Sequence, residues 1–190
     1  MEAVRSAPPS IPSRTGVWVG IAAITMSFAA YTSALLVRQS AAPDWQHFQL
    51  PPVLYWNTVL LLASSGTLEL ARRRVARDGD AAALRSGLML LWLTLGMGLL
   101  FVAGQVVAWR DLMAQGLFLA TGPSTSFFYV FTALHALHLL GGIVALAVAN
   151  RRVHAGAGVR ALAALGSASL YWHFMGALWI YLLLVLTITM

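Results

Sequence analysis

Charged residues divide this sequence into long stretches that carry no formal charge. One stretch runs from Thr15 to Val37, another runs from Leu112 to Asn150, and no charged side chain follows Arg160. Each is at least as long as the roughly 20 apolar residues that a helix needs to cross the ~30 Å hydrocarbon core of a bilayer. Hydrophobic residues make up 59% of the chain and charged residues only 9%, against about 25% in a typical soluble domain. A soluble fold of this size cannot bury so much apolar side chain, so lipid must act as the solvent.

We therefore predict an all-α, polytopic membrane protein that forms one bundle of five transmembrane helices. Pro51 and Pro52 suit the first turn of the second helix, where a missing N–H costs little. Gly122, Pro123 and Ser124 interrupt the longest stretch before the fourth helix. We expect a disordered cytoplasmic tail at residues 1–15, and the first stretch exceeds the ~7–15-residue core of a cleaved signal peptide. The predicted spans are about 16–37, 52–68, 87–109, 126–149 and 164–188, all within one domain of residues 16–190.

The arginines predict the orientation of the bundle. Placing the N-terminus in the cytoplasm leaves only Arg38 and Arg110 on the outer side. Cytoplasmic loops of membrane proteins carry an excess of basic residues, so this orientation is favoured, and five spans then place the C-terminus outside. The basic residues on the cytoplasmic side are Arg5, Arg14, Arg72, Arg73, Arg74, Arg77, Arg85, Arg151, Arg152 and Arg160.

Several classes of function are disfavoured by the composition. The sequence has no cysteine, which excludes disulfides, thiolate nucleophiles, iron–sulfur clusters and cysteine-ligated zinc. A net charge of +6 would suggest nucleic-acid binding in a soluble protein, but these arginines lie between apolar spans, and we expect no nucleic-acid partner. A transporter or proton pump usually carries acids within its spans and has broken, repeated helices. This sequence shows neither pattern.

Three histidines fall within the predicted spans. His135 and His138 are three residues apart on one helix and share a face, and His173 lies near the middle of the last span. The three can meet at one depth, so one interpretation is a haem or metal site in a small membrane cytochrome. The interpretation that we favour is a structural cluster of interhelical hydrogen bonds.

Glu69 lies at the end of the second predicted span and is the acidic residue best placed for a role in the membrane. One hypothesis makes it a proton-relay acid. The hypothesis that we favour is an interfacial ion pair with Arg72 and Arg73, which follow at the i+3 and i+4 positions of the same helix.

Several segments in order along the chain resemble subunit III of the haem–copper oxidases, the cytochrome c and quinol oxidases. The most specific runs from Phe127-Phe128 through Thr132 to His135 and His138, followed by Gly141-Gly142. Further similar segments are Asn57-Thr58 with Leu60 to Ser65, Gln105 with Ala108-Trp109, and Tyr171-Trp172-His173-Phe174 with Trp179. With five predicted spans, the chain resembles the short bacterial form, which lacks the first two of the family's seven helices.

The resemblance implies a non-catalytic subunit of a respiratory terminal oxidase in a bacterial inner (plasma) membrane. It implies no cofactor in this chain, haem and copper in partner subunits I and II, packing against subunit I, and a bound phospholipid. The complex would reduce oxygen to water with proton translocation, and a supercomplex with its electron donor is possible in this class. The residues that it assigns to a structural polar cluster, or to subunit and lipid contact, are His135, His138, His173, Trp172 and Gln105.

Two departures from the family pattern concern carboxylates. The segment from Ile24 to Phe28 lacks the glutamate that the family often has there, and Gly176 stands where the family often has aspartate. Roles of those carboxylates therefore do not transfer. Two alternatives remain open at this point: an accessory membrane subunit of nitric oxide reductase, and a small haem-binding cytochrome that uses His135, His138 and His173.

Overall fold

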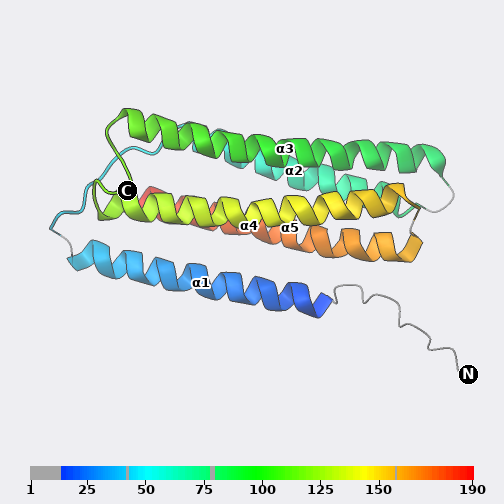
Figure 1. Cartoon of the computed structure of the whole chain (residues 1–190), viewed down its shortest axis with the longest axis horizontal. Helices are drawn as coiled ribbons and strands as arrows, with labels where there is room; N and C mark the ends of the chain where they lie inside the picture. The colour runs from blue at the N-terminus through cyan, green and yellow to red at the C-terminus, as the bar shows by residue number, and fades with distance from the viewer. Residues whose placement is uncertain (1–13, 42, 78–79, 157) are drawn as a thin grey trace, which may run out of the picture.

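The computed structural model describes residues 14–41, 43–77, 80–156 and 158–190, and within them it is all-helical (Figure 1). The predicted tail lies almost wholly outside the described residues. Its last two residues, Arg14 and Thr15, already form the first turn of a helix, which corrects the predicted boundary. The helices are α1 (Arg14–Ala41), α2 (Val53–Val75), α3 (Ala81–Ala114), α4 (Pro123–His154) and α5 (Gly158–Thr189).

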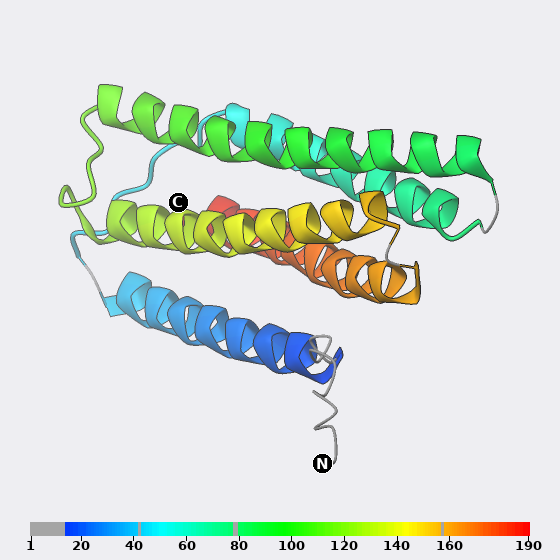
Figure 2. The same cartoon turned by 45° about the vertical axis from the view of Figure 1, so that its right-hand side comes forward.

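The helices alternate in direction along one common axis. The start of α1, the α2–α3 connection and the α4–α5 connection lie at one end, and the C-terminus lies at the other (Figures 1 and 2). Helix α2 packs against α3 and α5, and α4 packs against α3 and α5. Helix α1 lies on the outside of this four-helix group, against α4 and α5 (Figure 2). All the arginines of the described residues lie at the first end, except Arg38 and Arg110.

Each helix extends beyond the predicted span at one or both ends, although α2 begins at Val53, one residue after its predicted start. The predictions counted uncharged residues, whereas the helices continue through the flanking arginines, whose long side chains keep the charge in water while the backbone stays helical. Local signals set two of the starts. Asp80 precedes α3 and accepts hydrogen bonds from the N–H groups of Ala82 and Ala83, both at 2.9 Å. Gly122 precedes α4 in an extended conformation, and Pro123 takes the first position.

Among the described helices, α1, α3, α4 and α5 are long and apolar enough to cross a membrane. Helix α2 carries more polar side chains, but those on its inner face bond within the bundle. Asn57 donates to the carbonyl of Phe101 at 3.3 Å, and Thr67 pairs with Thr94 at 2.8 Å. The polar side chains on the inner face of α2 therefore serve contacts between helices.

Two glycines let α3 approach its neighbours closely. A Cβ on Gly104 would collide with the carboxamide of Asn57 on α2, and a Cβ on Gly98 would lie 2.6 Å from the ring of Trp172 on α5. Small residues at such crossings are typical of membrane helix packing, because van der Waals contact and hydrogen bonds replace the hydrophobic effect there.

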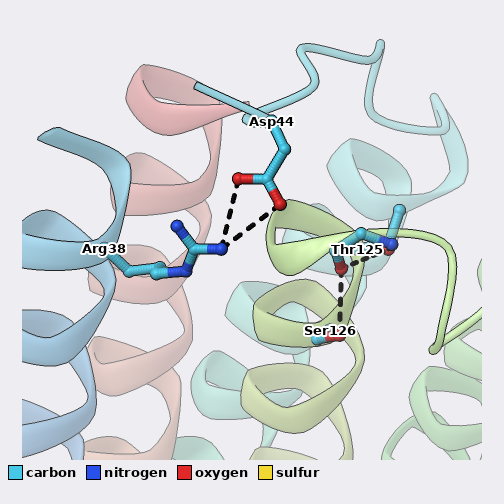
Figure 3. Close-up of polar contacts among 5 residues, drawn as sticks. Arg38, Asp44, Thr125 and Ser126 are labelled. Atoms are coloured by element: carbon cyan, nitrogen blue, oxygen red, sulfur yellow. Dashed lines mark hydrogen bonds and ion pairs between the residues drawn. The ribbon is translucent and has the colours of Figure 1, made fainter. Parts of the chain in front are cut away.

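The α1–α2 connection packs against the C-terminal end of α5, at the end of the bundle opposite the arginine-rich end. Trp45 donates its indole N–H to the carbonyl of Thr189 at 3.0 Å, and the backbone N–H of Phe48 bonds to the carbonyl of Met190 at 3.0 Å. These bonds satisfy carbonyls at the end of α5 that have no partner within the helix. Arg38 pairs with Asp44 at 3.1 Å, close to the first turn of α4 (Figure 3).

Candidate functional site

Three tryptophans make polar contacts between helices of the bundle. Each donates its indole N–H to a hydroxyl on a neighbouring helix: Trp172 to Ser64 at 3.0 Å, Trp179 to Thr58 at 2.9 Å, and Trp109 to Thr132 at 3.0 Å. The first two join α5 to α2, and the third joins α3 to α4. A large ring thus fills space between helices while its N–H is satisfied, as a buried indole requires.

His135 lies in the first half of α4, toward the end of the bundle that is opposite the arginine-rich end. It is fully buried on α4, with its ring centroid 5.0 Å from that of Trp179 and 5.8 Å from that of Phe101. Neither ring nitrogen hydrogen-bonds to another residue of the described chain. The histidine is therefore enclosed by aromatic rings from α3 and α5, with its polar atoms unpaired by protein groups.

Gln105 is the second buried side chain of this kind. It lies on α3 one turn after Phe101, is fully buried, and has neither amide atom paired within the described residues. Since a residue one helical turn away shares its face, Gln105 points to the same side of α3 as Phe101. Because Phe101 contacts the ring of His135, Gln105 and His135 lie at a similar level of the α3–α4 interface, which we call the polar layer.

His138 has a different environment. Its Nδ1 bonds to the carbonyl of Leu134 in its own helix at 2.7 Å, so that nitrogen carries the proton. Its ring contacts the edge of Phe28 on α1, with centroids 5.9 Å apart. His138 therefore faces α1, whereas His135 faces α3 and α5.

His173 lies apart from the other two histidines, on the exposed side of α5. Its neighbour in sequence, Trp172, points into the bundle, and successive residues of a helix point about 100° apart. His173 therefore lines a hollow of about 310 Å³ between α1, α2 and α5. Arg14, Trp18, Glu69, Arg72 and Ser169 line the same hollow.

Glu69 forms the ion pair that the sequence suggests. Its carboxylate accepts hydrogen bonds from Nε of Arg72 at 3.0 Å and from Nε of Arg73 at 2.9 Å. All three side chains lie on the same helix, at the end of α2 where the arginines gather. This contact is local and joins no two helices.

The structure thus divides the predicted cluster. Gln105 and His135 share one layer, and Trp172 bonds to Ser64 in another. His138 faces α1, and His173 lines the hollow between α1, α2 and α5. Within the described residues no group of three or more His, Asp or Glu side chains is placed to hold a metal ion. Sequence reasoning missed the hydroxyl partners Thr58 and Ser64, although their polarity in a predicted span was the available signal.

The family model for cytochrome c oxidase subunit III matches residues 22–189, which include almost all of the five helices and every residue of the polar layers. This chain belongs to the cytochrome c oxidase subunit III family. The family assignment agrees with the resemblance carried by the motifs around His135, His138 and Trp172.

Curated relatives from bacteria and an archaeon support the assignment. The probable cytochrome c oxidase subunit 3 of Mycobacterium tuberculosis is 34% identical over 167 residues, which cover 84% of this chain and 77% of the relative. The cytochrome c oxidase subunit 3 of Thermostichus vulcanus is 29% identical over 172 residues, covering 85% and 77%. The heme-copper oxidase subunit I+III of Aeropyrum pernix is 28% identical over 182 residues, covering 90% of this chain and 22% of that longer protein.

The chain is therefore a helical, multi-pass membrane protein of the subunit III family. Four apolar helices and the family assignment agree on this point. In its interior, the indole N–H groups of Trp172, Trp179 and Trp109 are used in bonds between helices.

Proposed function

We propose that this chain is the non-catalytic subunit III of a respiratory terminal oxidase of the cytochrome c oxidase type. The observation that carries the proposal is the family match over residues 22–189. The whole complex would reduce oxygen to water and translocate protons, and this subunit would pack against subunit I and stabilise it. The name of the Aeropyrum relative, subunit I+III, supports a close association of the two subunits.

The redox cofactors of the complex belong to subunits I and II in this proposal, and this chain binds neither haem nor copper. The separate environments of the histidines support it. His135 is enclosed by Phe101 and Trp179, His138 bonds to its own helix, and His173 is exposed on another face. A haem held by two of them would need these side chains to converge.

All five helices span a bacterial inner membrane in this proposal, with the N-terminus in the cytoplasm and the C-terminus outside. The gathering of arginines at one end of the bundle supports this orientation. The pairing of α2 supports its inclusion as the fifth span, because Asn57, Thr58 and Ser64 bond to groups on α3 and α5 and are not left facing lipid.

A phospholipid would bind in the apolar groove between the inner half of α1 and the pair α4–α5. The groove has a volume of about 510 Å³. Gly16, Gly20, Gly141 and Ala145 leave room for an acyl chain, and Arg152 stands at the arginine-rich end, where a phosphate group would lie. Native mass spectrometry of the complex should show one fewer retained phospholipid in Arg152→Gln, with Arg85→Gln as the matched control. An unchanged lipid count in Arg152→Gln would remove the groove as a lipid site.

Purification through a tag on this chain tests the proposal for the whole protein. In mild detergent, mass spectrometry should find a haem-bearing subunit I and a copper-bearing subunit II, and the optical spectrum should show haem in the complex and none in this chain alone. Co-purification with a nitric oxide reductase would favour that alternative. A chain that purifies alone and keeps a haem spectrum would overturn the proposal.

A further inference from the structure

Gln105 and His135 lie at one level of the α3–α4 interface. Phe101, one turn before Gln105, contacts the ring of His135. Trp109, one turn after Gln105, donates to Thr132, which lies three residues before His135. Along the antiparallel helices Gln105 lies between these two contacts, at the level of the α4 turn from Thr132 to His135.

The other polar groups of this layer are already bonded. Trp179 uses Thr58, the indole of Trp109 uses Thr132, and Thr132 donates to the carbonyl of Phe128 at 2.7 Å. Asn57 donates to the carbonyl of Phe101. The amide of Gln105 and the imidazole of His135 are the two buried side chains of the layer without a bonded partner among the described residues.

The two side chains have complementary polar atoms but are not in direct hydrogen-bond contact. A neutral imidazole offers one donor and one acceptor, and a carboxamide offers an acceptor oxygen and two N–H donors. Fully buried polar groups on facing helices that bond to no protein atom are the setting in which a buried water bridges protein groups.

We propose that Gln105 and His135 hold one internal water molecule between α3 and α4. The water would accept a hydrogen bond from the amide NH₂ of Gln105 and donate to the unprotonated ring nitrogen of His135. The rings of Phe101 and Trp179 enclose the site. The water bridge would join α3 to α4 near the Trp109–Thr132 hydrogen bond, as a second polar link between these two helices.

A cryo-electron microscopy map of the complex purified through this chain, at a resolution that shows ordered waters, tests the site directly. A density peak within hydrogen-bond distance of both side chains is the expected result, and it should be lost in Gln105→Met. A map in which the imidazole and the carboxamide bond to each other directly, or in which no density lies between them, would overturn the proposal.

A double-mutant cycle gives a test that does not depend on the map. Removing either side chain leaves the other buried and unpaired. Gln105→Met and His135→Leu should therefore each shorten the half-life for unfolding of this subunit in the heated complex about tenfold. The double variant should lose no more than either single variant, because no polar group is then left unpaired. A hundredfold loss in the double variant would show that the two residues share no site.

The control pair is Gln105→Met with His138→Leu. His138 faces Phe28 on α1 and bonds to its own helix, so the two effects should multiply. Coupling of the same size in this pair as in the Gln105–His135 pair would mean that the cycle reports general loosening of α4, and it would remove the evidence for a shared water.

Discussion

Helix α1 and the four-helix group α2–α5 are held by different numbers and kinds of contact. Helix α1 buries five of its 28 residues, whereas α5 buries 13 of its 32. Hydrogen bonds from Trp172 and Trp179 join α5 to α2 in the interior. Helix α1 has two side-chain bonds to α5, both at half-exposed or partly buried positions: Tyr181 donates to Thr32 at 3.0 Å, and Gln39 donates to the carbonyl of Thr189 at 3.3 Å. The four-helix group is therefore specified by its own packing, while much of α1 remains available to lipid or to a neighbouring subunit.

The largest expected effect comes from a single methyl group in the four-helix group. Gly98→Ala places a Cβ 2.6 Å from the buried ring of Trp172, and overpacking of this kind costs about 1–3 kcal/mol. The thermal unfolding temperature of the purified complex should fall. Gly20→Ala on α1 is the control, because nothing lies within 4 Å of its added Cβ. Equal losses in the two variants would show that α1 is packed as closely as α3.

Ser64→Ala tests the hydrogen bonds that distinguish the two regions. It leaves the indole N–H of the fully buried Trp172 without its acceptor, which costs about 1–3 kcal/mol. Thr32→Ala removes the corresponding acceptor on α1, but half-exposed Tyr181 can turn to another partner, so the loss should be smaller. Thermal unfolding of both variants in the same detergent measures the difference. A larger loss for Thr32→Ala would reverse the comparison.

His173→Ala probes the hollow between α1, α2 and α5. The side chain is exposed and makes no hydrogen bond within the described residues, so the subunit itself should lose little stability, about 0.5 kcal/mol or less. Retention of subunit I during purification should fall, and the haem spectrum of the complex that remains should be unchanged. Full retention would mean that the hollow faces lipid, and loss of haem from intact complex would assign His173 a role in cofactor binding.

Glu69→Gln should have the smallest effect. The carboxylate pairs with Arg72 and Arg73 on its own helix at a partly exposed position, and such pairs contribute about 0–1 kcal/mol. Oxygen consumption by the complex should stay close to that of the unchanged protein. Arg72→Gln, which removes a cationic partner of the same ion pair, is the matched control variant. A large decrease in proton uptake in Glu69→Gln alone would show that Glu69 relays protons.

The predicted helices agree with the structure because the signals behind them are local. The proline at Pro123 and the absence of charge between Leu112 and Asn150 both act on the chain near their own position. The ends were less well predicted, since a helix continues past the first arginine at little cost when the charge can reach water. Arg14 and Thr15 in α1 are the clearest example.

The structure brings together only some of the residues that the sequence suggested for one cluster. Equal depth in the membrane suggested that His135, His138 and His173 meet, but depth leaves the rotation of each helix about its axis undetermined. One residue of difference turns a side chain by about 100°, which places Trp172 inside the bundle and His173 outside it. The hydroxyl partners Thr58 and Ser64 could not be assigned for the same reason.

By itself the sequence determined that the chain is helical and membrane-embedded, where its helices fall, and which family it resembles, because hydropathy, charge and short motifs are summed along the chain. The tertiary structure alone decided which polar side chains meet. It placed Gln105 and His135 at one level of the α3–α4 interface, paired Trp172 with Ser64, and left α1 at the edge. Contacts between helices depend on rotation and register, and a membrane bundle sets both through close packing at a few small residues such as Gly98 and Gly104.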